Sequence, residues 1–439
     1  MQKLEDIVQK AKKKGADAAD AVCISASLED IGVRNRALEN IDYAESHDLG
    51  LRVILNGRQA NVSFSDNDSI CLDDIVDELM TKVKILPQDP YAIIAPNHKK
   101  IISELNLFDT TIQTSEKLLE DALELEDVAL SHKGITQSLG ASVSQVQKSF
   151  TLVNSFGFSG SYKRSSFAKS VSVLAGEGEN MVRDYAYSQA VFLQDLKSSQ
   201  AIGDEAASLT LQKLNPTTPK TAKLPIVFAP RMARRLLGII ASAINGGVIV
   251  KKSSFLLEQI NQQILPEELS LIDCPLLEKG LASRPFDGEG KESQINKLID
   301  NGILKTWLLD ERSAFELGLK STASAQRGVS SPHAGCTNLI LEGQMQPTAE
   351  LMKQNASGIY ITEMMGNGIN MLNGDISQGA SGFIIDKDGR LGEPISNFTI
   401  AGKLPDMLKA LQAGDDADTS YTIVTPTLSV SELIVAGQN

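Results

Sequence analysis

Apolar residues recur at helical spacing at the start of the chain. Leu4, Ile7, Val8 and Ala11 fall on one face of a helix, and Gly15 follows as a stop signal. The segment after it alternates between apolar and polar residues, as a half-buried strand does. The pattern therefore predicts an opening helix followed by strands.

A β-hairpin is predicted in the segment LGLRVILNGRQANVSFS. Leu51, Val53 and Leu55 alternate with polar neighbours, and Asn56-Gly57 permits the positive φ angles of a tight turn. A helix is expected next, and its apolar stripe comprises Leu72, Ile75, Val76, Leu79 and Val83. The first unit therefore reads helix, strands, helix.

The same order of elements repeats from residue 101 onward. Ser115 is expected to cap a helix, residues 141–155 and 161–175 read as strands, and a helical stretch ends near Leu214. The two units share no residue-level identity, so their duplication is a hypothesis from the pattern alone. The proline-rich segment LNPTTPKTAKLP then breaks the periodicity. We therefore expect an N-terminal α+β unit in residues 1–100, a second in 101–214, a linker in 215–225 and a C-terminal domain in 226–439.

Glycine-rich, strand-like runs dominate the rest of the chain. TNLILEG, GIYITEM and GASGFIIDKDGRLGEPISNFTIAG precede a final SELIVAGQN. The segment from Asp386 to Gly389 is expected to be a turn between two strands, because it lacks the later ligands of a calcium loop. The class predicted for the whole chain is α+β, with a curved or barrel-like C-terminal sheet and accompanying helices.

The run RRLLGIIASAINGGVIVKK, residues 234–252, is apolar between basic ends. A membrane-spanning helix needs roughly 20 mostly apolar residues, and this run is shorter and interrupted by Ser242, Asn245, Gly246 and Gly247. It is therefore expected to be a buried helix that ends at the two glycines.

Composition favours a soluble globular protein with more than one domain. The chain has 439 residues, of which 42% are hydrophobic and 22% charged. Its net charge of −13 would repel nucleic acid and anionic membrane surfaces. Four separated cysteines form no CxxC pair, and acids are mixed into the first amphipathic segment. These features predict a cytoplasmic protein without disulfides.

Few residues offer visible chemistry. His333 and Cys336 resemble half of a zinc site, but no second ligand pair follows, so an ordinary polar loop is favoured. Asp287 and Glu289 could act as paired carboxylates, although acids in a glycine-rich turn are usually solvated. The glycine-rich pieces lack the spacing of a phosphate-binding loop, and no serine-nucleophile motif is present. The residues alone therefore indicate neither an active site nor a metal site.

Several phrases together resemble one family. They are GGVIVKKSSFL, SRPFDGEG, TNLILEG, ITEMMGNGIN and, within the block from Ile361 to Met407, NGDISQGASGFIIDKDGRLGEPISNFTIAGKLPDM. Over nearly its whole length the chain is similar to the TldE-type branch of the TldD/PmbA family. Such proteins resemble halves of a cytosolic zinc peptidase, in which a TldD-type chain pairs with a TldE-type chain.

The resemblance implies a place for the family's HExxxH motif, which would lie in the first helix of the C-terminal domain. Leu237 and Ser242 fall near the two histidine positions, and Gly238 falls near the glutamate. Neither leucine nor glycine can bind zinc or move a proton. The later metal-binding cysteine is also missing, since no cysteine follows Cys336. The resemblance therefore implies a noncatalytic chain without its own zinc, whose TldD-type partner supplies metal and catalytic residues.

The resemblance also implies a heterodimer, a homodimer when the partner is absent, and an extended or unfolded peptide as substrate. Within the most family-like block, Gly374, Asp375, Ser377 and Gly379 are candidate substrate contacts, although a structural turn is the favoured interpretation for each. Two alternatives stay open. One is a stand-alone regulatory or binding protein, in line with the family's label as a modulator of DNA gyrase. The other is a self-sufficient peptidase that uses His333, Cys336 and nearby acids.

Overall fold

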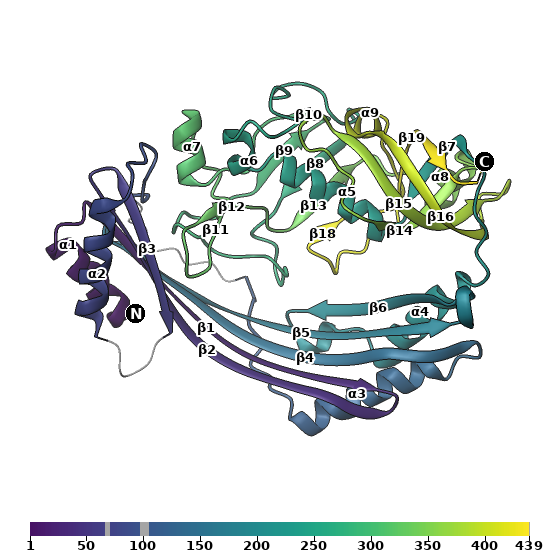
Figure 1. Ribbon diagram of the computed structural model, residues 1–439, viewed down its shortest axis with the longest axis horizontal. Coiled ribbons are helices and arrows are strands. Elements are labelled where there is room, and N and C mark those ends of the chain that lie inside the picture. Colours follow the sequence, from purple (N-terminus) through teal and green to yellow (C-terminus); the bar gives the residue numbers. More distant parts are fainter. Residues whose placement is uncertain (66–70, 97–104, 439) are drawn as a thin grey trace.

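Figure 1 shows the computed structural model of the chain, which describes residues 1–65, 71–96 and 105–438. Six antiparallel strands form an N-terminal sheet in the order β3-β2-β1-β4-β5-β6. The strands are β1 (Ala18–Arg34), β2 (Ala37–Leu55), β3 (Arg58–Ser65), β4 (Ile135–Asn154), β5 (Ser159–Ala175) and β6 (Val182–Ala190). The sheet is strongly curved and holds the C-terminal part of the chain on its concave side.

Both predicted units contribute three strands to this one sheet. The first unit runs from α1 (Gln2–Lys13) through β1–β3 to α2 (Leu72–Ile85), and the second from α3 (Ser115–Leu130) through β4–β6 to α4 (Ser199–Gln212). The predicted order of helix, strands, helix is therefore confirmed in each unit. The units join where β1 pairs with β4, with Ser27 opposite Gln147 near the middle. The boundary expected after residue 100 lies outside the described residues.

Alternation along β1 places the helices and the C-terminal part on opposite faces of the sheet. Ala19 and Ala21 pack into the cluster under α1 and α2, and Ile31 and Val33 pack under α3 and α4. Residues of the other parity, such as Val22, pack toward the C-terminal part instead. The two helix pairs thus cover the two ends of one outer face.

The predicted helical stripes are largely buried as expected. Leu4, Ile7, Val8 and Ala11 are the buried residues of α1. The predicted cap at Ser115 is wrong by one position, because the side chain of Thr114 accepts the hydrogen bond from the backbone N–H of Lys117. The hairpin turn at Asn56-Gly57 is confirmed, with both residues at positive φ.

The predicted barrel-like C-terminal sheet is a closed barrel of five strands. The strands are β7 (Ala222–Phe228), β14 (Ile359–Met365), β15 (Asp375–Ile385), β16 (Leu391–Lys403) and β19 (Leu428–Ala436). Their order is β16-β15-β14-β7-β19, and pairing between β16 and β19 closes the ring. The turn predicted from Asp386 to Gly389 lies between β15 and β16, with Gly389 at positive φ.

A second sheet and several short elements pack beside the barrel. The sheet has the order β10-β9-β8-β13-β18. The strands of this sheet are β8 (Leu269–Asp273), β9 (Asn296–Asp300), β10 (Ile303–Leu304), β13 (Leu339–Gly343) and β18 (Ile423–Val424). The other short elements are β11 (Ala325–Gln326), β12 (His333–Ala334), β17 (Gln412–Ala413), α7 (Glu311–Leu317), α8 (Thr348–Gln354) and α9 (Leu404–Lys409). One hydrophobic cluster joins the barrel, this sheet and the helix after β7. None of the helices in the described ranges is long and apolar enough to cross a membrane.

The apolar run near residue 240 forms two helices instead of one. Helix α5 (Pro230–Ala243) ends before the glycines, and α6 (Gly246–Val250) begins at them, so the predicted end of the helix is wrong. Asn245 causes the break: its side-chain oxygen accepts from the N–H of Gly247, and its amide donates to the carbonyl of Ala334. Gly246 also passes too close to Ser313 for any larger residue. The expectation of a buried helix holds for α5.

The DGEGK loop, residues 287–291, also differs from its prediction. Asp287 and Glu289 are buried, whereas the pattern predicted solvated acids. The Asp287 carboxylate accepts hydrogen bonds from the backbone N–H groups of Glu289, Lys291 and Ala325, so it organises the loop from inside. Burial raises the pKa of both carboxyl groups.

Candidate functional site

Leu237, Gly238 and Ser242 of α5, the residues that the resemblance places near the family's metal motif, lack the chemistry of a metal site. Leu237 is fully buried in the core, and Ser242, on the exposed side, donates its hydroxyl proton to the carbonyl of Gly238. Gly238 lies against Ile423 of β18. Leu, Gly and Ser supply no imidazole, carboxylate or thiolate, so these residues do not fit the zinc that the family implies.

His333 and Cys336 are not brought into a ligand cluster. His333 is exposed on β12, while Cys336 is partly buried and packs against the core. Burial raises the pKa of the Cys336 thiol to about 11, so it is protonated near neutral pH and is a poor metal ligand. Within residues 1–65, 71–96 and 105–438, no three His, Cys, Asp or Glu side chains gather as a metal site would require.

The four candidate contacts of the NGDISQG segment lie where β15 begins. Gly374 has a φ of +78°, and its N–H donates to the carbonyl of Asn370, so it forms a turn. Asp375 and Ser377 are exposed, and the Ser377 N–H donates to the carbonyl of Gly368. Gly379 of β15 lies opposite Met365 of the neighbouring strand β14. Gly374 and Gly379 thus have backbone roles. The exposed Asp375 carboxylate accepts a hydrogen bond from the Asn373 side chain, and the Ser377 side chain is exposed.

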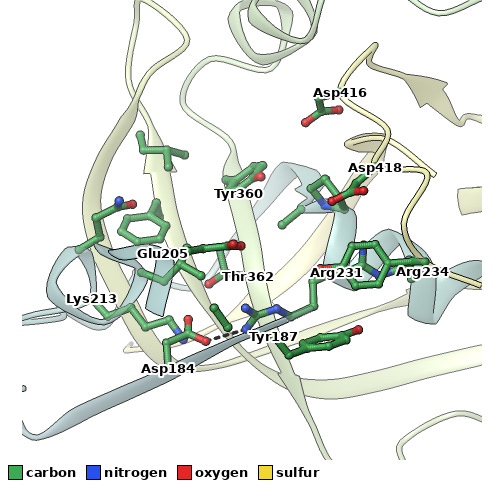
Figure 2. Close-up of a pocket in the computed structure, with 18 residues that line it drawn as sticks. Asp184, Tyr187, Glu205, Lys213, Arg231, Arg234, Tyr360, Thr362, Asp416 and Asp418 are labelled. Carbon is green, nitrogen blue, oxygen red and sulfur yellow. Dashed lines mark hydrogen bonds and ion pairs between the residues drawn. The ribbon is translucent and has the colours of Figure 1, made fainter. Parts of the chain in front are cut away.

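A pocket of about 290 Å³ lies at the junction of the N-terminal sheet and the barrel, near the start of α5. Figure 2 shows charged and aromatic side chains from both sides facing this space. The lining residues come from β6, α4, α5, β14, β15, β16 and the loop before β18; they are Asp184, Ala186, Tyr187, Glu205, Leu209, Gln212, Lys213, Ala229, Pro230, Arg231, Arg234, Tyr360, Thr362, Phe383, Leu391, Asp416, Asp418 and Tyr421. The pocket therefore depends on both halves of the chain.

An ion triad around the buried Asp184 fixes one wall of the pocket. Asp184 of β6 pairs with Arg231 of α5 at 2.6 Å and with Lys213, which follows α4, at 2.9 Å. Arg231 also donates to the backbone carbonyl of Tyr185. Burial alone would raise the pKa of the Asp184 carboxyl, but the two cations outweigh burial and lower it. The triad joins the edge strand of the sheet to the helix.

Beside the triad, Arg234 of α5, Tyr187 and Tyr421 also line the pocket. The Arg234 guanidinium lies 3.7 Å from the centre of the Tyr421 ring, and that ring packs edge-on against Tyr187. Within the described part of the chain, Arg234 makes no ion pair, unlike Arg231. Gly238 follows one turn later on the same face of α5 and contacts the same segment of chain. Arg234 is thus a cation available to a ligand, one turn before Gly238 on α5.

The polar groups of the pocket are suited to binding a ligand. Burial raises the pKa of Tyr360 to about 12, so its hydroxyl stays protonated and cannot act as a base near neutral pH. Glu205 and Asp418 both face Lys197, at 3.7 and 3.5 Å. The lining among the described residues includes no His, Cys or Ser. The lining combines Arg234 with the carboxylates of Glu205, Asp416 and Asp418, so the arrangement suits recognition of a polar ligand.

A second junction lies at the other end of the C-terminal part. Asp20 of β1 accepts from Arg52 of β2 and from Arg327, which follows β11, and all three side chains are buried. Phe286 packs against Phe158 and Tyr162 of the sheet nearby. We call Asp20, Arg52 and Arg327 the Asp20 clamp.

Neither junction was found from the sequence. The ionic residues of each junction lie far apart in the chain, as Asp184 and Arg231 do. The sequence around each of these residues has only the ordinary pattern of a strand or a helix. Arg234, at the basic start of the apolar run, is the one charged pocket residue that the sequence pattern included. Long-range pairing of this kind leaves no local pattern to detect.

Family models match almost the whole chain. They are described as the PmbA/TldA metallopeptidase domain 1, central domain and C-terminal domain, over residues 19–81, 109–214 and 221–437. The metalloprotease PmbA of Escherichia coli O157:H7 is 32% identical over 99% of this chain and 96% of its own length. A metalloprotease PmbA homolog of Haemophilus influenzae is 31% identical over 98% of this chain and 94% of its own length.

Solved structures have the same fold. A candidate modulator of DNA gyrase from Bacteroides thetaiotaomicron superposes with a TM-score of 0.91 and 25% identity, over 99% of this chain and 98% of that one. TldE from Thermococcus kodakarensis superposes with a TM-score of 0.89, over 99% of both chains; at 17% identity this likeness concerns the fold alone. The chain therefore belongs to the PmbA/TldD metallopeptidase family, on its PmbA/TldE-type side.

Proposed function

We propose that this chain is the noncatalytic subunit of a cytoplasmic two-chain zinc peptidase. Its partner would be a TldD-type chain that holds the zinc and the catalytic residues, and the substrate would be an extended or unfolded peptide. The relatives named metalloproteases support a peptidase context. The division of labour between the two chains is our inference.

The observation that carries this proposal is the chemistry of α5. In this proposal α5 corresponds to the family's metal-binding helix, and the residues taken to stand near its two histidine positions are a buried Leu237 and an exposed Ser242. Replacing a charged site with leucine lets the helix pack as core, which avoids burying unpaired polar groups. A chain that keeps the fold but fills this position with core residues is suited to support a catalytic partner.

The pocket gives the subunit a role toward substrate. Arg234 lies one turn before Gly238 on the same helical face, and no carboxylate in the described part of the chain pairs with it. An arginine in this setting favours a carboxylate, such as the free end of a peptide. Asp375 and Ser377 are further candidates for substrate contact because their side chains are exposed.

Coexpression tests the proposal directly. This chain and a TldD-type chain from the same genome should copurify and hydrolyse an unfolded peptide, whereas this chain alone should not. A partner variant with the HExxxH glutamate changed to glutamine is the control, because it should abolish hydrolysis without breaking the complex. Hydrolysis by this chain alone would contradict the proposal, and so would failure of the two chains to associate.

Two variants of this chain refine the test. Arg234→Gln should raise the KM for peptides with a free carboxyl end and leave amidated peptides unaffected. His333→Ala should leave hydrolysis by the complex unchanged, since His333 is exposed and lies in no ligand cluster. Loss of activity in His333→Ala would instead support a self-sufficient site at His333 and Cys336.

A further inference from the structure

Residues 37–47 of β2, which we call the arm, pair with another described strand along one edge only. Its residues pair with β1 on one side, while β3 pairs only with the part of β2 from Asp48 to Leu55. Among the described residues, nothing pairs with the other edge of the arm. Unpaired N–H and C=O groups therefore line it for roughly 36 Å, at about 3.3 Å per residue.

Apolar side chains are exposed along the same arm. Leu38, Ile41 and Tyr43 are 48%, 53% and 64% exposed. Ile41 lies directly opposite Ile31, which is buried under α3, so the apolar row of the sheet continues past the helix onto the bare strand. An open edge with exposed apolar residues is a site where proteins normally add a strand or block one.

The charge of the arm decides which strand fits it. Residues 37–47 read ALENIDYAESH, with three acids and no Lys or Arg. Glu39 pairs with Arg34 of β1 at 3.4 Å, whereas Asp42 and Glu45 make no ion pair with any described residue. Asp42 already lies opposite Asp30 of β1, and burial together with the Asp42 charge raises the pKa of the Asp30 carboxyl. A second copy of the arm would add three more acids beside these, in two chains that each carry −13. An identical chain is therefore a poor partner.

We propose that residues 37–47 dock a strand of a different chain, one that carries Lys or Arg opposite Glu39, Asp42 and Glu45 and apolar side chains beside Ile41 and Tyr43. This inference rests on the proposed function, because the partner is taken to be the second subunit. Backbone hydrogen bonds would supply affinity, and the acids would select the partner's charge.

A double variant tests the surface. Ile41→Asp with Tyr43→Asp should weaken the mixed complex by at least about tenfold in Kd, because it places charge on the docking face. Ile85→Asp is the control, since Ile85 is more exposed and lies at the end of α2, away from the arm. The triple variant Glu39→Lys, Asp42→Lys and Glu45→Lys should also weaken the complex, by repelling a basic strand. Melting temperature would confirm that each variant is folded.

Hydrogen exchange of the backbone amides tests the same surface in the unmutated protein. Alternate amides of residues 37–47 already bond to β1, and the remaining ones should become protected when the partner is added. If the wild-type complex forms while these amides stay unprotected and the double variant binds normally, this inference is wrong but the proposed function stands. If no TldD-type chain binds, both are overturned. If sedimentation shows that this chain self-associates and the triple variant does not, the docked strand belongs to a second copy.

Discussion

Single buried aspartates hold the two halves of this chain together. Asp20 bonds Arg52 of its own sheet and Arg327 of the C-terminal part, and Asp184 does the same with Lys213 and Arg231. In each case one carboxylate satisfies two cations from opposite sides of the junction. Removing Asp20 would leave two buried arginines without this partner, which is far more costly than losing a surface pair. Removing Asp184 should cost less, because Lys213 also pairs with Glu363 and Arg231 is partly exposed.

Asp20→Asn should therefore destabilise the protein strongly. Loss of one partner from a buried pair typically costs about 3–5 kcal/mol. Thermal unfolding checks this, and Asp73→Asn is the matched control because Asp73 pairs with Lys10 at an exposed site. Similar melting temperatures for the two variants would show that the Asp20 clamp contributes little.

The same clamp predicts a pH dependence. Although burial opposes it, the charges of Arg327 and Arg52 lower the pKa of the Asp20 carboxyl from 3.8 to about 2. A carboxyl group with a lowered folded pKa stabilises the protein above its unfolded pKa and loses that contribution as the pH falls through the folded value. The stability difference between wild type and Asp20→Asn should thus be constant from about pH 5 to 8 and shrink below about pH 4. A difference that changes most near neutral pH would point to another group.

At the scale of elements, the sequence predicted periodic segments well and their ends less well. The stripe of α1 and the hairpin at Asn56-Gly57 follow from local spacing, so they were recoverable. The break between α5 and α6 depends on Asn245 bonding Ala334 and on Gly246 touching Ser313, which are distant contacts. The burial of Asp287 has the same origin, since Ala325 from another segment completes its hydrogen bonds.

Restoring the missing motif on α5 should not create a zinc site. The triple variant Leu237→His, Gly238→Glu, Ser242→His lacks the third protein ligand, and it buries an imidazole where Leu237 packs without exposure. The change at Leu237 alone should cost about 2–5 kcal/mol. Elemental analysis and thermal unfolding check both statements, with Ser242→His as the control. Stoichiometric zinc in the triple variant would show that a third ligand is already in place.

Two glycines of the family-like block should respond differently to alanine. At Gly374, φ is +78° and a Cβ atom would meet Pro405 at 2.7 Å, so alanine is strained and should cost about 1–3 kcal/mol. At Gly379 the nearest atom is Met365 Cβ at 3.7 Å, an ordinary contact, so alanine should be tolerated. Chemical denaturation measures both. Equal losses would show that the positive φ of Gly374 and the close approach of Pro405 do not set the cost of alanine there.

The arrangement of the whole molecule was only half predictable. The α+β class, the repeated unit and the barrel-like C-terminal sheet follow from the order of elements along the chain. The joining of both units in one curved sheet, and the pocket where that sheet meets the barrel, depend on pairing between β1 and β4 and on the Asp184 triad. Such contacts join residues that are separated by long stretches of chain, so they leave no periodic signal in the sequence.

The central claim is that this chain keeps the family fold while leaving zinc and catalysis to a partner. Its most direct test is zinc per chain, measured by elemental analysis on untagged protein purified alone and on the coexpressed complex. We predict far less than one zinc in the chain alone and about one in the mixed complex. One tightly held zinc in the chain alone, resistant to dialysis against a chelator, would contradict the account and make this chain a candidate peptidase in its own right.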